Sequence, residues 1–339
     1  MIMKELNIKK HQQTDMFIAD ILDAKIKDDI HSMEHQIFSL SKRKNTKIVQ
    51  YEHNGKTIEI VPSVKGQANI WDKDILMYCG SQLMAAINKK RIPKRKIRIN
   101  AYDFFISTNR GTGGNDYILF LRSLERLLGT NIKTNIKTNN HEITEYFGLI
   151  DNLKIVRETK SKKGDKGATI VDITLSEWQY NSILGSEMLT LNDDYFRLKK
   201  GLHRALYLHA RKHCGSQGKY QVGLEKIHKK IRSDSPIRKF KFYIKELVKE
   251  PGYILDYKLD YNEKEKMLTF YNKSMNGLLA ESKDSLKKID KDLVKHVAKD
   301  NIITADDIKQ AERVYEGVMK QSGDKAVASL IRDKMLRKE

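Results

Sequence analysis

Apolar side chains recur at helical spacing along residues 235–250, and polar signals mark both ends of this segment. The apolar stripe consists of Ile237, Phe240, Ile244, Leu247 and Val248. Ser235 can accept a hydrogen bond from a free N–H of the first turn, and Pro236 suits the first helical position. Pro251 and Gly252 end the pattern. The segment is therefore predicted to be a helix that buries one face.

The basic side chains of this predicted helix lie on another face, and they are Arg238, Lys239, Lys241, Lys245 and Lys249. A helix of this length spans about 24 Å, and the major groove of B-DNA, about 12 Å wide, admits an α-helix. Taken alone, the segment is open to two interpretations: a core helix with a solvated basic face, or a helix that meets negative charge.

Helical patterns precede this segment, and an alternating pattern follows it. Helices are expected at residues 198–214 and 224–231, and a polar turn around Ser233 leads into the basic helix. Apolar and polar side chains alternate over residues 253–261, which predicts a strand, and residues 267–271 are expected to return beside it. Three helices and a β-hairpin in this order are typical of a winged-helix domain, whose third helix reads the major groove.

The charge of this region favours the recognition helix over the solvated face. Between Arg211 and Glu250 there are twelve Lys or Arg and four Asp or Glu. Each basic side chain that neutralises a phosphate releases condensed counterions, so this density predicts salt-sensitive DNA binding. Arg232, in the turn before the basic helix, is a further candidate contact.

The first half of the chain repeats this order of elements. The expected elements are helices at 72–89, 101–108 and 116–128, and strands at 97–100, 130–138, 150–159 and 169–175. In the third of these helices, Leu119, Leu124 and Leu127 are expected to point inward. Sequence identity between the two halves is too low to prove a repeat, so the proposed duplication rests on element order.

The expected fold class is α+β, with two tandem winged-helix domains. The expected parts are an N-terminal arm at 1–66, winged-helix domains at 67–186 and 187–273, and a helical C-terminal appendage at 274–339. The arm should contain a helix at residues 16–22 and a β-hairpin at residues 47–61 with an Asn-Gly turn. The appendage has few aromatics and a helical stripe of Ile308, Ala311, Val314, Tyr315 and Val318.

Composition supports a partner that is negatively charged. The chain has 339 residues and a formal net charge of +20, which points to nucleic acid or an anionic membrane surface. No apolar run approaches the roughly 20 residues that a membrane span needs, and the first ten residues lack the apolar core of a signal peptide. The two cysteines, Cys79 and Cys214, are expected to be core residues. A cytoplasmic location without membrane association is therefore expected.

Candidate catalytic and metal sites are weak. The glycine turn at residues 111–116 lacks the pattern of a phosphate-binding P-loop. His209, His213 and Cys214 share one predicted helix, but no second cysteine pair completes a structural zinc site. Asp193 and Asp194 have no evident carboxylate partners for a nuclease metal site. No catalytic residue, metal or cofactor is expected, and the chain is not expected to be an enzyme.

Seven stretches between residues 32 and 247 resemble the RepA-type plasmid replication initiators, the replication initiator protein A family. They include SMEHQIFSLSKRK, YEHNGKTIEIVPSVKGQANIWDKDILMYC, AYDFFISTNRGTGG, LERLLGTNIKTNI, FGLIDNLKIV, LTLNDDYFRLKKGLHRALYLHARKHCG and SPIRKFKFYIKEL. The resemblance implies an initiator that binds repeated sequences (iterons) in double-stranded DNA at a plasmid origin and helps to open the duplex. It further implies recruitment of the host's replicative helicase and host initiator, and repression of its own promoter as a homodimer.

The contacts expected with DNA follow from helical geometry rather than from the resemblance. Bases should be read by Arg238, Lys239, Lys241 and Lys245, whereas Arg110, Arg122, Arg126 and Lys133 should contact mainly phosphates. The main alternative is a winged-helix transcriptional repressor with no role in initiation. A relaxase or nuclease is a third reading, which a DNA-nicking assay would test.

Overall fold

The computed structural model describes residues 16–34, 36–53, 56–138, 141–157, 169–250, 254–274, 280–282, 284, 313 and 315–316. The chain divides into two compact units. The first comprises Met1–Lys212, Leu224–Glu246 and Tyr253–Leu255, and the second comprises His213–Gly223, Leu247–Gly252 and Asp256–Glu339. Several expected features lie outside the described residues: the Asn-Gly turn, the end of the basic helix at Pro251 and Gly252, and most of the C-terminal appendage.

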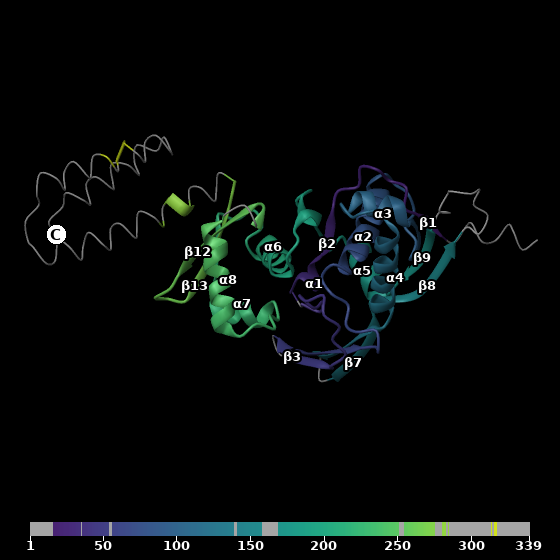
Figure 1. Cartoon of the computed structure of the whole chain (residues 1–339), viewed down its shortest axis with the longest axis horizontal. Helices are drawn as coiled ribbons and strands as arrows, with labels where there is room; N and C mark the ends of the chain where they lie inside the picture. Colours follow the sequence, from purple (N-terminus) through teal and green to yellow (C-terminus); the bar gives the residue numbers. More distant parts are fainter. Residues whose placement is uncertain are drawn as a thin grey trace, which may run out of the picture. The chain divides into compact units, whose positions relative to one another are not determined.

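A four-stranded sheet and its covering helices form the core of the first unit (Figure 1). The strand order is β1-β5-β9-β8, made of Phe17–Ile18, Lys96–Asn100, Thr169–Leu175 and Ile150–Arg157. Helices α3 (Ala101–Ser107) and α4 (Gly114–Leu128) contact this sheet, and α5 (Glu177–Leu184) contacts α2 (Lys73–Asn88). All but three of the sixteen residues of α2 are buried, so this helix is central to the unit.

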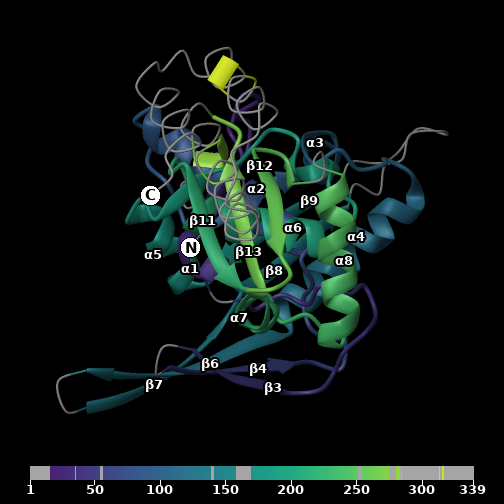
Figure 2. The same ribbon diagram turned by 90° about the vertical axis from the view of Figure 1, so that its left-hand side faces the viewer.

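A second sheet of the first unit joins segments that are distant in the sequence. Its order is β3-β4-β6-β7, made of Val49–His53, Lys56–Pro62, Thr130–Thr138 and His141–Gly148. The β3–β4 hairpin confirms the expected one, and it continues into β6, where the buried Ile60 lies opposite Ile132. Figure 2 shows β6 and β7 as a long ribbon. Strand β7 was not expected, because its apolar residues do not alternate strictly with polar ones.

The remaining elements are a small two-stranded sheet, a short helix beside it and the elements that come after α5 in the sequence. A two-stranded sheet pairs β2 (Lys27–Asp29) with β10 (Met188–Thr190), and α1 (Ile30–Glu34) follows β2. After the short 3-10 helix η2 (Tyr195–Arg197) come α6 (Gly201–His213), β11 (Lys219–Gly223), α7 (Leu224–Lys230) and α8 (Ile237–Lys249). In the second unit, β11, β13 (Met267–Asn272) and β12 (Tyr257–Asn262) form one antiparallel sheet.

Two sets of elements follow the same order along the chain. The first is α2, β5, α3, α4, β8 and β9, with β6 and β7 inserted before β8, and the second is α6, β11, α7, α8, β12 and β13. In each set the last strand pairs between the other two, giving the orders β5-β9-β8 and β11-β13-β12. The sheet order therefore reveals a correspondence that residue identities do not. Strand β11 was not expected in the second set.

Four local expectations are wrong. Residues 16–22 do not form a helix, because Phe17–Ile18 is a strand that pairs in parallel with β5. The strand predicted over residues 253–261 begins only at Tyr257, since Leu255 has a φ of 46° and lies in a turn. Leu119 is 47% exposed and Ile237 is 41% exposed. Both residues lie at the margin of the buried face of their helix. Helical spacing alone therefore overestimated the width of the two apolar faces.

Candidate nucleic-acid interface

Helix α8 presents a buried apolar face and a solvent-facing basic one. Phe240 and Ile244 are fully buried, and the ring of Phe240 meets His228 of α7 edge-on, with centroids 4.9 Å apart. The Pro236 carbonyl accepts the first hydrogen bonds of the helix, from the backbone N–H groups of Lys239 and Phe240. The beginning of α8 is also held by His228, whose Nε2 donates to the carbonyl of Ser235 at 2.7 Å. The helix is thus fixed along one face and at its N-terminus.

The expected base-reading residues occupy the other positions of α8. Arg238 and Lys239 are exposed, Lys241 and Lys245 are half-buried, and Lys249 is exposed at the last turn. The Nζ of Lys239 lies 5.8 Å from the ring centroid of Tyr243. Phe242 is 58% exposed on the same helix, so the surface offers apolar as well as cationic contacts. Base edges present both hydrogen-bond groups and thymine methyl groups, which such a mixed surface can read.

Arg232, in contrast, is occupied by the N-terminal part of the chain. Its Nη1 donates to the carbonyl of Gln36 at 2.8 Å, and its guanidinium lies 5.3 Å from the ring centroid of Tyr51. Burial lowers the pKa of Arg232. The residue has a φ of 50°, in the left-handed region. These contacts give Arg232 a role in fixing the turn between α7 and α8.

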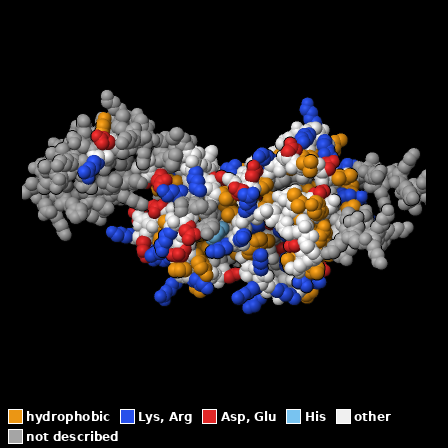
Figure 3. All heavy atoms as spheres, turned by 45° about the horizontal axis from the view of Figure 1, so that its top comes forward, with side chains coloured by type: hydrophobic (Ala, Val, Ile, Leu, Met, Phe, Trp, Pro, Cys, Tyr) orange, Lys and Arg blue, Asp and Glu red, His pale blue; other side chains and the backbone are white. Residues whose placement is uncertain are grey.

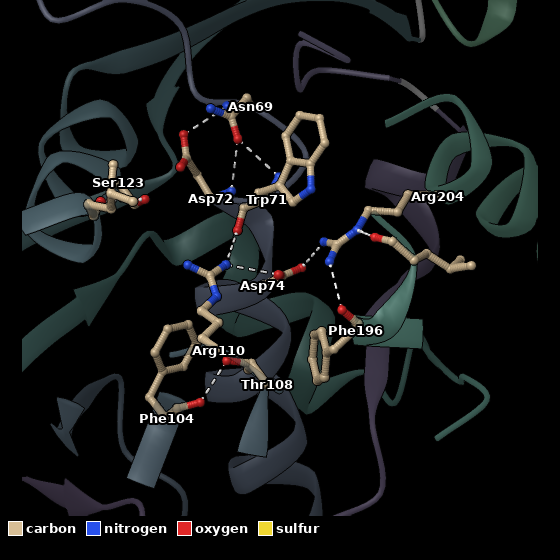
Figure 4. A network of polar contacts seen from close by, with 12 residues as sticks. Asn69, Trp71, Asp72, Asp74, Phe104, Thr108, Arg110, Ser123, Phe196 and Arg204 are labelled. Atoms are coloured by element: carbon tan, nitrogen blue, oxygen red, sulfur yellow. Dashed lines mark hydrogen bonds and ion pairs between the residues drawn. The ribbon is translucent and has the colours of Figure 1, made fainter. Parts of the chain in front are cut away.

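Two of the arginines expected to contact phosphate, Arg126 and Arg110, donate to carboxylates at the start of α2. Figure 4 shows the part of this polar network around Arg110 and Asp74. Arg126 donates through Nε and Nη2 to the two carboxylate oxygens of Asp72, each at 2.7 Å. This contact raises the pKa of Arg126. Arg110 donates through Nη2 to Asp74, at 2.9 Å, and to the Trp71 carbonyl. A phosphate contact from either arginine would have to compete with these buried carboxylates.

A third arginine completes this network and was missed by sequence reasoning. Arg204 of α6 is buried, and its Nη1 lies 2.6 Å from the second carboxylate oxygen of Asp74. Its other nitrogens donate to the carbonyls of Leu198 and Phe196. The Asp-Lys-Asp sequence at the start of α2 was the available signal, because acidic side chains favour a helix N-terminus. It did not reveal which arginines would meet it.

The other two expected phosphate contacts are more accessible. Arg122 is exposed on α4, one turn before Arg126. Lys133 lies on β6, 3.9 Å from Glu59 and 5.4 Å from the ring centroid of Tyr146. Hydrogen bonding to Tyr146, and then the charge of Glu59, raises the pKa of Lys133. Five of the basic residues expected to contact DNA therefore lie together on α8. The four expected in the first set of elements lie on the turn before α4, on α4 and on β6.

The glycine turn before α4 has a structural explanation. Oδ2 of Asp116 accepts a hydrogen bond from the backbone N–H of Gly113 at 3.0 Å, and the N–H of Asp116 donates back to the Gly113 carbonyl. A Cβ atom at Gly111 would lie 2.6 Å from the same carboxylate oxygen, so a side chain there would displace the Asp116 carboxylate. This turn caps the helix from within.

The histidine and cysteine considered as metal ligands pack against neighbouring residues of the described part of the chain. His213 stacks on Tyr220 with ring centroids 5.2 Å apart, and the Cys214 thiol is buried beside the carbonyls of Gln217 and Phe270. Burial raises the pKa of Cys214 to about 11. Among the described residues there is no group of three or more His, Cys, Asp or Glu placed to hold a metal ion. Nor does any helix described there have the length and apolar character to cross a membrane.

Charge on the molecular surface is mixed. Lys and Arg side chains are spread over the face seen in Figure 3, with Asp and Glu among them. The net charge of +20 favours attraction to any polyanion, such as DNA. The basic side chains of α8, in contrast, are gathered on one helix.

Known structures share the fold. The chain is similar to crystallised domains 2 and 3 of RctB, in a selenomethionine derivative, with a TM-score of 0.53 and 12% sequence identity; the similarity covers 72% of this chain and 98% of that one. A second crystal structure of RctB domains 2–3 gives a TM-score of 0.50 and 13% identity over the same shares. The mixed α+β architecture is thus shared with solved domains at very low identity.

Sequence relatives are closer. A protein of Wigglesworthia glossinidia brevipalpis named "Putative replication protein" is 40% identical over 273 residues, which cover 79% of this chain and 97% of that protein. Residues 27–259 match the family model described as Replication initiator protein A. The match extends over the first set of elements and most of the second, from β2 into β12. On this evidence the chain belongs to the Replication initiator protein A family.

Proposed function

We propose that this protein starts replication of a plasmid by binding repeated sequences at its origin through two winged-helix units. Membership of a replication initiator family supports the role in initiation. The order helix, strand, helix, helix, strand, strand in both sets of elements, with the same strand order in each sheet, supports the two winged-helix units. The proposed domain limits are 67–186 and 187–273, and strands of the preceding segment 1–66 pair onto the sheets of the first domain.

The observation that carries the proposal is the basic face of α8. Arg238 and Lys241 are three residues apart, so they lie on neighbouring positions of one helical face. An arginine can bind the O6 and N7 atoms of guanine with two hydrogen bonds, and an aromatic ring can contact a thymine methyl group. Arg238 and Phe242, four residues apart and both exposed, suit such a pair of contacts.

The first set of elements contributes phosphate contacts and holds its own helices in place. Arg122 and Lys133 serve as the phosphate contacts, because both have exposed or half-exposed side chains. Arg126 ties α4, and Arg110 ties the turn between α3 and α4, to Asp72 and Asp74 at the start of α2. The protein does no covalent chemistry on DNA in this proposal; it opens the duplex by binding, and the host supplies the helicase.

A replication assay separates initiation from the alternative, a repressor of the same fold. A small plasmid that carries the gene and its adjacent repeats, but no other initiator, should replicate with the wild-type protein. The variant Arg238→Ala should bind the repeats more weakly and replicate the plasmid less efficiently. Normal binding without replication by the wild-type protein would favour a repressor. Nicking of supercoiled plasmid by the protein with magnesium or manganese would instead contradict the non-enzymatic mechanism.

A further inference from the structure

A cavity of about 680 Å³ in the first unit is lined by none of the residues assigned to DNA binding, although one lining residue, Tyr146, contacts Lys133. Its wall is formed by the end of β7, by α5, by His31 of α1 and by residues just after α5. From α5 it receives Trp178, Asn181 and Ser182, at positions that share one face of a helix. Opposite them, β7 contributes the segment from Glu145 to Gly148. The cavity volume is in the range of sites that bind small ligands or side chains.

The charge of the cavity is opposite to that of the protein. Four carboxylates line it, from Glu145, Asp151, Glu177 and Glu187, in a chain whose net charge is +20. Asp151 is paired with Arg95, and Glu187 accepts from His31 at 2.7 Å. No basic partner of Glu145 or Glu177 is present among the described residues. These two carboxylates therefore leave negative charge available to a cation.

The cavity also offers an aromatic surface and an unused polar group. Trp178 stacks on Phe147 with ring centroids 5.1 Å apart and an angle of 25° between the planes. The methylene groups of a long basic side chain pack well on such rings while its charged end meets a carboxylate. Ser182 is only 3% exposed, and its hydroxyl oxygen has no hydrogen-bond partner in the described part of the chain. A buried hydroxyl without a partner is costly, so a donor supplied by a ligand would relieve it.

Strand β7, beside the cavity, favours a cationic group that is part of a peptide. Strand β7 ends the sheet order β3-β4-β6-β7, so its outer edge has backbone groups that no neighbouring strand pairs within that sheet. An extended peptide can add to such an edge by main-chain hydrogen bonds, and alternate side chains then enter adjacent pockets. Tyr146, 67% exposed on β7, adds contact area at the rim. Small free cations lack these contacts, and the positive net charge of the protein repels them.

We propose that an extended peptide segment of a partner protein adds to the β7 edge and inserts an arginine or lysine side chain into this cavity. Its cationic group meets Glu145 and Glu177, its methylene groups pack on Trp178, and one of its N–H groups donates to Ser182. This site is independent of the DNA-binding proposal, because none of its residues belongs to the proposed DNA contacts. It gives the protein a separate surface for a protein partner.

The two tryptophans make a site-resolved test possible. Trp178 lines the cavity and Trp71 does not, so the indole N–H signals of the full-length protein in a ¹H–¹⁵N spectrum report on the cavity and on a reference position. The variant Trp178→Phe assigns the two signals. The probe is the peptide acetyl-Thr-Val-Arg-Val-Thr-amide, and the control is the same peptide with neutral citrulline in place of arginine.

The arginine peptide should move the Trp178 signal saturably, with a dissociation constant of about 1 mM or below, and leave the Trp71 signal in place. Glu177→Gln and Glu145→Gln should each weaken binding by about threefold, and Ser182→Ala by about fivefold. Glu265→Gln, the same charge change in the turn between β12 and β13, is the matched control and should bind as the wild type does. All these variants should retain wild-type DNA affinity, which separates this proposal from the previous one.

Several results would overturn the proposal. An unshifted Trp178 signal would do so, as would equal binding of the citrulline peptide or unchanged binding to the two Gln variants. Binding of methylguanidinium without binding of the peptide would exclude a protein-borne cation. Replacement of either valine of the peptide by proline should weaken binding, because proline cannot donate to the β7 edge; unchanged binding would contradict the added strand.

Discussion

Arg126 and Asp72 are joined by two parallel hydrogen bonds of 2.7 Å, so the last turn of α4 is tied to the residue that precedes α2. Asp72 is 1% exposed and the Arg126 side chain is 22% exposed. A carboxylate this deeply buried depends on its cation, because removal of the partner leaves an uncompensated charge. The pair therefore fixes the end of α4 against the start of α2.

Arg126→Ala should lower the free energy of unfolding by about 3 kcal/mol, the loss expected when one member of a buried pair is removed. Urea denaturation followed by circular dichroism measures this change. Arg122→Ala, one turn earlier and exposed on the same helix, is the matched control and should change stability by less than about 0.5 kcal/mol. Equal stability of the two variants would show that the Asp72 contact does not hold α4.

Arg238→Ala should weaken binding to the origin repeats by about 1–3 kcal/mol, because a two-bond contact with a base is lost. Binding to random DNA of the same length should change less. Fluorescence anisotropy with both DNAs at one salt concentration gives the comparison. Lys25→Ala removes an exposed charge paired with Asp193 and serves as the control. If Arg238→Ala weakens binding to both DNAs equally, Arg238 contacts phosphate rather than bases.

The double variant Arg122→Ala, Lys133→Ala tests the phosphate contacts of the first unit. Each phosphate contact contributes about 0.9 to the slope of log K against log salt concentration on duplex DNA, so the slope should fall by about 2. The loss of affinity should be similar for specific and random DNA. An unchanged slope with a folded protein would show that these two residues do not bind phosphate.

The contrast between Arg122 and Arg126 shows where the sequence stops being informative. Helical spacing correctly predicted α4 and placed both arginines outside its apolar stripe. It could not show that Arg126 meets a carboxylate 54 residues away, since that contact depends on how α2 and α4 pack. Local periodicity likewise predicted α8 and the β3–β4 hairpin. It missed β7 and β11, whose strand character comes from pairing with β6 and β13.

Charge patterns suffered from the same limit. Basic residues outnumber acidic ones from Arg211 to Glu250, yet they have different environments in the structure. Arg238 is exposed on α8, whereas Arg232 donates to Gln36 and lies over Tyr51, both from the N-terminal part of the chain. Counting charges cannot separate these cases, because burial by a distant segment has no signature in the local sequence.

Both cysteines should resist alkylation in the native protein. Burial raises the pKa of Cys79 to about 12 and that of Cys214 to about 11, so at pH 8 both thiols are protonated and unreactive. Reaction with iodoacetamide, followed by mass spectrometry, should be slow in native buffer and should add two groups in urea. Fast native labelling of either cysteine would show that its segment opens readily.

Glu34 is placed to hold two lysines of the second set of elements. Its carboxylate oxygens lie 2.9 Å from Nζ of Lys212 and 3.1 Å from Nζ of Lys230, and all three side chains are at most 18% exposed. Glu34→Gln should therefore lower the free energy of unfolding by about 2 kcal/mol, since two ammonium groups then share a poorly solvated place. Asp193→Asn, which removes an exposed pair with Lys25, should have little effect.

The same substitution should have the opposite effect on affinity for DNA. Loss of the Glu34 charge increases the positive potential around Lys212 and Lys230, so affinity for random DNA should stay equal or rise, with a slope against salt at least as steep. Anisotropy titrations at several salt concentrations measure both quantities. A protein that becomes less stable while it keeps or gains non-specific affinity fits a carboxylate that restrains basic side chains. A fall in both stability and affinity would instead show that Glu34 supports the DNA-binding surface as a whole.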